Sequence, residues 1–281
     1  MNFLVFSDEI ITSRQNRTVV DLCKLSDRKE REARKLFRFD GIKLFDEAVR
    51  NHLDLELVAL RATSADEIAK RMEALHGEGL FSRFGRVVLL SDDVFSKISE
   101  EKSPEGVICI AKYIDKFQKI VTIYNSADFL NMKNERIVLL ESVRDPSNIG
   151  AIIRSAAAIG IDRLILSADC ADIYHPKAVR ASMGTLFNQP IDRVPNLAAV
   201  IRRMRENGRR VFAAALDENA VRLGEFATEH GDCVVIGNEG HGLLPETVKA
   251  CDRSVMIPMT DRAESLNAAV AASILMWEFS R

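Results

Sequence analysis

Three segments in the second half of this 281-residue chain carry polar residues of the kind that bind or activate a substrate. They read DPSNIGAIIRSAAAIG at 145–160, IGNEGHGL at 236–243 and IPMTDRAESLNAAVAA at 257–272, and each follows or begins at the end of an apolar stretch. If these stretches are parallel strands, their carboxyl ends share one edge of a sheet, where ligands of such sheets bind. The three segments are therefore predicted to form one site.

In the first segment, Pro146 and Asn148 suit a turn that leads into a helix, and Gly150 permits a close approach by a ligand or another backbone. Arg154 follows Gly150 by about one helical turn. The mostly apolar neighbours of Arg154 favour a cleft or an interface. The alternative is a surface arginine on an amphipathic helix, and these residues alone do not separate the two.

The second segment has three glycines, which let the backbone contact a ligand directly. It does not match the dinucleotide pattern GxGxxG, because Asn238 and Glu239 occupy the gap. A glutamate after a buried strand indicates function at Glu239, whereas His241 is expected to be an exposed turn residue.

Asn267 is the unusual residue of the third segment, because asparagine is a poor helix former and yet precedes a run of alanine and valine. A polar side chain beside the free N–H groups of a helix start suits an anionic or carboxylate ligand. Ser265 could instead simply cap the helix. The small residues at 268–273 permit close helix packing, either within the chain or across a dimer.

The elements that must position these segments follow an α/β pattern in both halves. In the second half, apolar strands at 137–140, 164–166, 210–215, 233–236 and 254–257 alternate with helices at 149–159, 197–206, 245–250 and 265–279 and with a helical turn at 176–182. This pattern predicts a parallel sheet covered on both faces. In the first half, strands at 55–60, 87–90 and 106–111 and helices at 19–37, 42–50, 65–75 and 92–99 predict a smaller α/β sandwich. The pattern loses its regularity between 112 and 136, so two domains are expected, at 1–125 and 126–281.

Composition excludes several classes of protein. Hydrophobic residues make up 47% and charged residues 28%, which favours a packed core over disorder. A net charge of −2 excludes a uniformly basic protein but permits a local basic face. The five cysteines lack disulfide or zinc spacing, so no metal is expected. No signal sequence or membrane-spanning run is evident, so a cytoplasmic protein without a membrane partner is expected.

In their order and spacing, the three segments resemble the three motifs of the SpoU/TrmH-type RNA 2′-O-ribose methyltransferases. The segment VRASMG at 179–184 is also similar to that family between its first two motifs. The resemblance covers about residues 136–281, and residues 12–125 resemble the ribosomal-protein-like substrate-binding domain that many members carry in front. It implies a SPOUT fold, in which the C-terminal segment of a parallel-sheet α/β domain is threaded into a deep trefoil knot. Ordinary connection rules would exclude such a chain path.

The resemblance implies a homodimeric enzyme that uses S-adenosylmethionine to methylate ribose 2′-hydroxyls of structured RNA, ribosomal RNA in preference to transfer RNA. Each subunit of such a dimer completes the site of the other. By motif, the catalytic residues are Arg154, Asn148, Glu239, Ser265 and Asn267, with Arg154 as the activator of the 2′-hydroxyl. The cofactor would be held mainly by backbone groups, at Gly237, Asn238, Glu239, Gly240, Ile257, Met259, Leu266 and Asn267. One departure is Asp261-Arg262, where many members have glycine or another small residue, and this bears on loop shape and substrate contacts.

The implied reaction constrains the role of Arg154. A ribose hydroxyl is a poor nucleophile with a high pKa and needs a proton acceptor. A sulfonium methyl donor has a good leaving group, so no metal is required and placement contributes much of the rate. Arginine normally stays protonated. Two roles for Arg154 therefore stay open: it acts as the base, or it orients the hydroxyl and stabilises the developing charge.

Because the second domain resembles an RNA methyltransferase, the basic stretch near the N-terminus becomes the leading candidate for RNA recognition. Residues 24–38 contain seven basic and three acidic side chains, with Phe37 and Phe39 close by. Basic side chains neutralise phosphates and aromatic rings stack on unpaired bases. The alternative is a solvated helix with ion pairs such as Glu30–Arg34. The residues expected to contact RNA are Arg14, Arg17, Lys24, Arg28, Lys29, Arg31, Arg34, Lys35 and Arg38. A later cluster, at 202–210, flanks a helix end and is expected to be structural.

Two rival functions remain from the sequence. One is a non-catalytic RNA-binding protein that retains the methyltransferase fold, against which the joint presence of Arg154, Glu239, Ser265 and Asn267 argues. The other is a dinucleotide-dependent enzyme on an ordinary doubly wound sheet.

Overall fold

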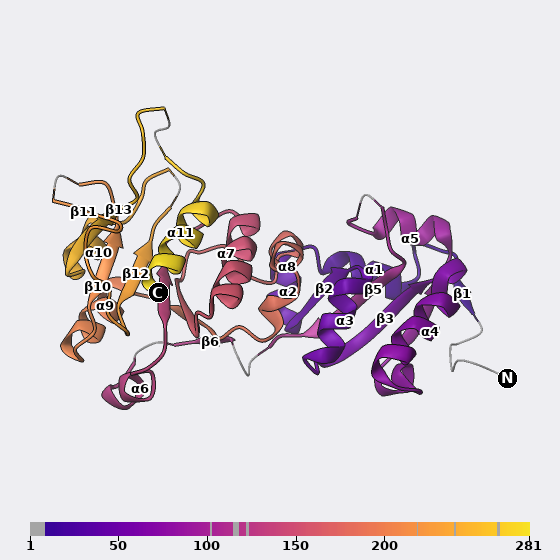
Figure 1. The fold of residues 1–281 in the computed structure, drawn as a ribbon. Helices are drawn as coiled ribbons and strands as arrows, with labels where there is room; N and C mark the ends of the chain where they lie inside the picture. Colours follow the sequence, from indigo (N-terminus) through magenta and orange to yellow (C-terminus); the bar gives the residue numbers. More distant parts are fainter. Residues whose placement is uncertain are drawn as a thin grey trace. The chain divides into compact units, whose positions relative to one another are not determined.

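The computed structural model describes residues 9–101, 103–114, 118–121, 124–217, 219–238, 240–262 and 265–281 (Figure 1). The chain divides into two compact units. Unit 1 comprises Met1–Ile114 together with Tyr174–Phe187, and unit 2 comprises Asp115–Ile173 and Asn188–Arg281. The short excursion at Tyr174–Phe187 makes both units discontinuous in sequence, a feature that the expected division into 1–125 and 126–281 does not contain.

Unit 1 is built on a five-stranded mixed sheet of strand order β1-β4-β3-β5-β2. Strands β1, β4 and β3 are parallel, and β5 runs antiparallel to both β3 and β2. The bounds are β1 (Ile10–Ile11), β2 (Leu36–Asp40), β3 (Leu55–Arg61), β4 (Val87–Leu90) and β5 (Val107–Lys112).

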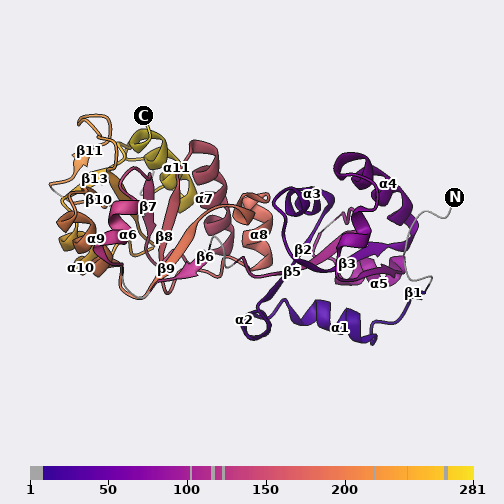
Figure 2. The same cartoon turned by 90° about the horizontal axis from the view of Figure 1, so that it is seen from below.

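Helices cover both faces of this sheet, which confirms the predicted smaller α/β fold (Figure 2). Side chains from α1 and α5, such as Leu22 and Phe95, share a buried core with alternate sheet residues such as Leu57 and Ile110. Helices α3 and α4 lie on the opposite face. The bounds are α1 (Arg17–Lys24), α2 (Arg28–Arg34), α3 (Ile42–Arg50), α4 (Ala65–His76) and α5 (Asp92–Ile98), with 3-10 turns η1 (Ala62–Ser64) and η2 (Leu80–Arg83).

The single helix predicted at 19–37 is wrong. Helix α1 ends at Lys24, because Asp27 accepts a hydrogen bond from Lys29 N and so caps a new helix, α2. Helix α2 stops at Lys35, which has a left-handed φ of 54°, and the chain continues as the buried strand β2. Because charged residues fill this stretch, its sequence pattern indicated neither the helix cap at Asp27 nor the strand at 36–40.

The excursion from the second half of the sequence fills an aromatic core in unit 1. It forms α8 (Pro176–Ser182) and η3 (Thr185–Phe187). The ring centroids of Tyr174 and Phe37 lie 4.7 Å apart, and those of Phe187 and Phe39 lie 5.4 Å apart. Gly184 joins the two elements with φ +91°, and a Cβ there would lie 2.6 Å from Cβ of Glu47. Only glycine fits this junction.

Unit 2 contains an eight-stranded sheet of order β11-β13-β10-β12-β7-β8-β9-β6, and every recorded strand pair in it is parallel. All four residues of β7 and of β12 are buried, as expected for strands covered on both faces. The predicted parallel sheet is confirmed. Its strands are β6 (Gln118–Ile120), β7 (Ile137–Leu140), β8 (Arg163–Ser167), β9 (Ile191–Val194), β10 (Val211–Ala214), β11 (Val221–Arg222), β12 (Cys233–Ile236) and β13 (Arg253–Met256).

Strand β9 was not predicted, because its sequence IDRV carries two charged residues. The structure explains their presence in a central layer. Asp192 is buried and accepts hydrogen bonds from the Tyr124 hydroxyl, at 2.7 Å, and from Arg163, at 2.8 Å. A buried carboxylate whose Oδ2 accepts two hydrogen bonds can occupy a strand that a hydrophobicity pattern would not reveal.

The helices of unit 2 are α6 (Ser126–Asn131), α7 (Pro146–Ile159), α9 (Leu197–Glu206), α10 (Pro245–Ala250) and α11 (Ala268–Phe279). Helices α7 and α11 lie side by side (Figures 1 and 2), and Ser273 Oγ donates a 2.8 Å hydrogen bond to Ser155 Oγ between them. Ser273, within the run of small residues at 268–273, therefore contributes to packing within the chain. No helix among the residues that the structure describes is long and apolar enough to cross a membrane.

Candidate functional site

The carboxyl ends of four neighbouring parallel strands hold the predicted site. In the sheet, β13, β10, β12 and β7 follow one another and all run in the same direction. The segments that follow them therefore leave from one edge: 141–145 after β7, 215–217 after β10, 237–244 after β12 and 257–267 after β13. The first, third and fourth contain or precede the three sequence motifs.

The second motif folds back on itself as a closed loop. The backbone N–H groups of Asn238 and Gly242 each donate to the carbonyl of the other, at 3.0 and 2.9 Å. Oδ1 of Asn238 accepts from the backbone of Gly240 at 2.9 Å and of His241 at 3.1 Å. A Cβ on Gly237 would lie 2.4 Å from the carbonyl carbon of Gly242, so the loop closes only with glycine at 237.

The same loop is fastened to the first motif segment. Nδ2 of Asn238 donates a 2.8 Å hydrogen bond to the carbonyl of Ser142, just after β7. The position of this turn is itself fixed, because Ser142 Oγ donates to Asp169 at 2.6 Å and the Ser142 N–H donates to Ser167 Oγ at 2.9 Å. Burial would raise the pKa of Asp169, but hydrogen bonds from Ser142, Ser167 and Arg144 outweigh it and lower the pKa below its usual value.

Glu141, the residue after β7, holds the far end of the second motif loop. The residue is 3% exposed, and its carboxylate accepts hydrogen bonds from Leu244 N at 2.8 Å and Thr247 Oγ1 at 2.5 Å. Both donors lie at the start of α10, where a negative charge is favourable. The loop at 237–244 is therefore fixed at one end by β12 and at the other by a carboxylate from β7.

The third motif meets the first through two asparagines. Nδ2 of Asn267 donates to Oδ1 of Asn148 at 3.0 Å, across 119 residues of sequence. Oδ1 of Asn267 accepts from Ala269 N and Val270 N, so Asn267, rather than Ser265, caps α11. The predicted helix start at Ser265 is therefore wrong by three residues. One side chain both begins the last helix and fixes the orientation of Asn148.

Several groups at this edge are available to a ligand. Among the described residues, no hydrogen bond joins the backbone of 257–262 to any other group. Ile257, Met259 and Leu266 are half-buried. Leu216 follows β10, between the two motif strands, and is 66% exposed. Sequence reasoning missed Leu216, although the predicted strand at 210–215 already placed the following residue at this edge.

Comparison with known proteins identifies the fold. The sequence model described as the SpoU rRNA Methylase family matches residues 135–277. The chain belongs to this family. A second model, the MRM3-like substrate binding domain, matches residues 16–109.

Similar proteins carry consistent names. The chain is 28% identical, over 95% of its length and 97% of the relative, to the Bacillus subtilis 23S rRNA (guanosine(2553)-2′-O)-methyltransferase RlmP. It is 34% identical, over 69% of its length and 67% of the relative, to a 23S rRNA (uridine(2479)-2′-O)-methyltransferase of Streptomyces viridochromogenes. The crystal structure of an AdoMet-bound rRNA methyltransferase from Sinorhizobium meliloti, 27% identical, superposes with a TM-score of 0.76 over 96% of this chain and 97% of that one.

Within this SpoU fold, some of the predicted site residues contact the other motif segments and others do not. Asn148 contacts Asn267 directly, and Asn238 contacts the turn after β7. Ser265 is exposed and leads into α11. Arg154 is exposed on α7 and forms no ion pair with any residue that the structure describes. Glu239, predicted for both catalysis and cofactor binding, lies outside the described residues.

Most of the residues expected to contact RNA are exposed on unit 1, but two are not. Arg31 is buried and donates 2.8 Å hydrogen bonds to the carbonyls of Leu25 and Ser26, at the end of α1. Arg38 is buried and pairs with Asp40 at 2.8 Å. The prediction that Arg31 and Arg38 contact RNA is therefore corrected, because both guanidinium groups satisfy internal acceptors. The residues that stay at least partly exposed are Arg14, Arg17, Lys24, Arg28, Lys29, Arg34 and Lys35.

Replacement of Glu141 by alanine tests the role of the carboxylate that holds the second motif loop. The change leaves Leu244 N and the Thr247 hydroxyl without their buried acceptor, which costs about 1–3 kcal/mol for each lost partner. We expect a lower free energy of unfolding in urea and weaker binding of S-adenosylhomocysteine by calorimetry. Thr247→Val, which removes one donor only, should show a smaller loss. Unchanged affinity in Glu141→Ala would show that the loop holds its shape without the carboxylate.

Proposed function

We propose that this chain is an S-adenosylmethionine-dependent methyltransferase that modifies a ribose 2′-hydroxyl in structured RNA, and in ribosomal RNA in preference to transfer RNA. The observation that carries the proposal is the meeting of the three family motifs around the turn after β7, through the Asn238–Ser142 and Asn267–Asn148 hydrogen bonds. The names of the relatives, both of them 23S rRNA 2′-O-methyltransferases, support the choice of ribosomal RNA.

The residues at the carboxyl edge fit S-adenosylmethionine. The backbone of 257–262, with no internal hydrogen bond among the described residues, offers N–H and C=O groups to the polar parts of the cofactor. Leu216, Ile257, Met259 and Leu266 offer apolar surface to its base. When bound, the cofactor supplies a methyl group on a cationic sulfur. We propose the backbone of Gly237, Ile257 and Leu266 as its principal contacts, with Asn238, Glu239, Gly240, Met259 and Asn267 in the same loops.

Helix geometry separates two of the proposed catalytic residues within one chain. Arg154 follows Asn148 by six residues, which is about 9 Å along the axis of α7 and about 240° around it. Asn148 faces Asn267 at the start of α11, so Arg154 projects from a different side of α7. This arrangement supports a site completed by a second subunit. We propose that Arg154 of one subunit orients or activates the 2′-hydroxyl bound near Asn148, Ser265 and Asn267 of the other.

The surface of α11 next to α7 supports a homodimer. Val270, Ile274 and Trp277 recur at helical spacing on one face of α11 and are 49%, 38% and 62% exposed. An exposed apolar stripe on a helix is favourable only when another surface covers it. A two-fold dimer through α7 and α11 would cover the stripe and bring Arg154 to the partner.

We infer from family membership that the C-terminal segment is threaded as a trefoil knot. The chain path supports this inference. Helix α11 follows β13 directly in sequence, yet it packs on β12 and α7, with β10 and β12 standing between β13 and β7 in the sheet. Residues 257–262 leave the end of β13, whereas Asn267, at the start of α11, already contacts Asn148 of α7.

We propose that the protein is cytoplasmic and that unit 1 is its RNA-binding unit. Unit 1 matches the substrate-binding family over 16–109 and carries the exposed basic side chains of α1 and α2. Some of these charges are balanced, since Arg28 pairs with Glu32 at 2.7 Å and Arg34 with Asp21 at 3.5 Å. Arg17 and Lys29 form no ion pair with a described residue and are the best RNA contacts to test.

A methyl-transfer assay with Arg154→Ala tests the function. Ribosomal RNA transcribed in vitro should gain 2′-O-methyl groups, detected by mass spectrometry of nucleosides, when incubated with the protein and S-adenosylmethionine. Arg154→Ala should lower kcat at least about 100-fold, the scale of general acid–base catalysis, with little change in S-adenosylhomocysteine affinity. Arg202→Ala, on the exposed face of α9, is the matched control.

The outcomes of this assay distinguish the rivals. RNA binding without any methylation would favour a non-catalytic protein. Stabilisation by NAD and not by S-adenosylhomocysteine in a thermal-shift assay would favour a dinucleotide enzyme. Full activity in Arg154→Ala would remove this residue from the mechanism.

Trp277→Glu tests the dimer. A charge in a buried apolar interface should raise the dimer dissociation constant at least about 100-fold, measured by sedimentation equilibrium. Activity should fall with the dimer population. Leu75→Glu, at an exposed leucine of α4 in unit 1, is the control and should leave the dimer intact. A monomeric wild-type protein with full activity would contradict the proposal.

Arg17→Glu with Lys29→Glu tests RNA recognition by unit 1. RNA affinity should fall about tenfold or more, and the slope of log affinity against log salt should fall by about one to two, because two phosphate contacts are lost. Lys70→Glu, on the opposite face of the sheet, is the control. Point changes are preferable to removal of the N-terminal half, which would expose Tyr174 and Phe187. An unchanged salt slope would exclude both residues from the RNA interface.

A further inference from the structure

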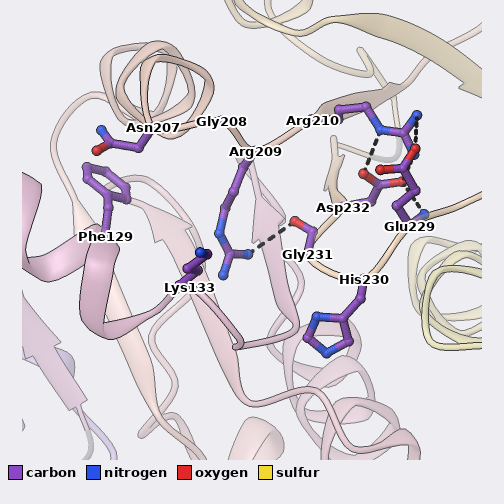
Figure 3. Close-up of a pocket in the computed structure, with 10 residues that line it drawn as sticks. All are labelled: Phe129, Lys133, Asn207, Gly208, Arg209, Arg210, Glu229, His230, Gly231 and Asp232. Carbon is purple, nitrogen blue, oxygen red and sulfur yellow. Dashed lines mark hydrogen bonds and ion pairs between the residues drawn. The ribbon is translucent and has the colours of Figure 1, made fainter.

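A cavity of about 280 Å³ is drawn in Figure 3. Its lining residues precede strands of the unit 2 sheet, so it lies at the amino-terminal edge, opposite the motif loops. Its walls are the end of α6 with the residue Lys133, the segment 207–210 that precedes β10, and the segment 229–232 that precedes β12. All three wall segments precede strands of a parallel sheet, whereas the three motifs follow strands. The cavity is therefore separate from the proposed cofactor site.

A buried guanidinium group without a carboxylate partner forms part of this cavity. Arg209 is 9% exposed, and all its recorded partners are uncharged. It donates to the carbonyl oxygens of Glu135, at 3.0 Å, and Gly231, at 3.2 Å, to the carbonyl oxygen of Met132, and to Sγ of Cys233 at 3.3 Å. Figure 3 shows its guanidinium group directed toward Lys133. A buried cation balanced only by dipoles favours an anion nearby.

The two carboxylates in the cavity wall do not balance Arg209, because both are bound to Arg210. Arg210 pairs with Asp232 at 2.6 Å and with Glu229 at 3.2 Å. Lys133 and His230 are exposed in the wall and form no ion pair with a residue that the structure describes. Two cations, Lys133 and Arg209, thus remain without a negative partner beside an imidazole.

We propose that this cavity binds a phosphate group. Guanidinium and ammonium groups bind phosphate oxygens through charge-assisted hydrogen bonds, and an imidazole N–H can donate a further one; one group of each kind lines this cavity. The phosphate has two possible sources, a free phosphate ion or a backbone phosphate of bound RNA. The RNA source rests on the function proposed above and would extend the RNA footprint onto unit 2.

A purely structural role explains Arg209 but not its neighbours. Its hydrogen bonds join the end of α6 to the segments before β7 and β12, so Arg209 also fastens the amino edge. A structural role of Arg209 does not explain why Lys133 and His230, which line the same cavity, form no ion pair with a described residue. These two exposed residues can be replaced with little effect on folding.

The first arm of the test uses inorganic phosphate and no RNA. Phosphate, compared with chloride at equal ionic strength, should raise the melting temperature of the wild-type protein by mass action. The double variant Lys133→Ala, His230→Ala should lose this shift. Lys249→Ala, at an exposed lysine of α10 that does not line the cavity, should retain it. Because this arm needs neither RNA nor cofactor, its result stands even if the proposed function fails.

The second arm measures methyl transfer to ribosomal RNA as a function of salt. If the phosphate belongs to RNA, the same double variant should raise KM for RNA about three- to tenfold. It should also lower the salt slope by about one, with kcat and S-adenosylhomocysteine affinity unchanged. A response in the first arm alone assigns the cavity to a free anion, and a response in the second alone assigns it to RNA. If the double variant matches wild type in both arms, the cavity does not bind phosphate and the proposal is overturned.

Discussion

The neighbouring positions of β7 and β12 determine how the site is built. The register pairs Val234 with Val138 and Ile236 with Leu140, so both strands end at the same level. The turn after β7 and the glycine loop after β12 are consequently adjacent, and short polar side chains suffice to join them. Asn238 reaches the carbonyl of Ser142, and Glu141 reaches the start of α10. A shift of the register by one residue would turn Glu141 to the other face and break both connections.

Much of the fold could be predicted from the sequence, because continuous apolar strands and amphipathic helices leave clear patterns. The strands at 137–140 and 233–236 and the helices at 42–50 and 197–206 have the predicted bounds. What failed has physical causes. The 19–37 stretch contains a helix cap and a buried strand within a charge-rich sequence, and β9 contains a carboxylate that only tertiary hydrogen bonds make tolerable.

The site was predicted in outline and not in detail, because contacts between segments distant in sequence leave no local pattern. Glycine, asparagine and glutamate in three loops after strands indicated one site, and the strand order places these loops at one edge. No local pattern could show that Asn267 bonds to Asn148, because that contact spans 119 residues. Nor could it distinguish Arg31 and Arg38 from their exposed neighbours, since burial of an arginine depends on carbonyls and carboxylates supplied by other segments.

A chain of net charge −2 can bind a polyanion only if its negative charges are kept from the substrate. Around the first motif the carboxylates are already engaged. Glu141 is buried against the start of α10, Asp145 accepts the N–H of Asn148 as the cap of α7, and Asp169 is held charged by Ser142, Ser167 and Arg144. Each is therefore compensated within the protein by a helix start, a hydroxyl or an arginine, which weakens its repulsion of RNA phosphates. Arg154, exposed and without an ion pair among the described residues, leaves positive charge on α7 to act on the substrate.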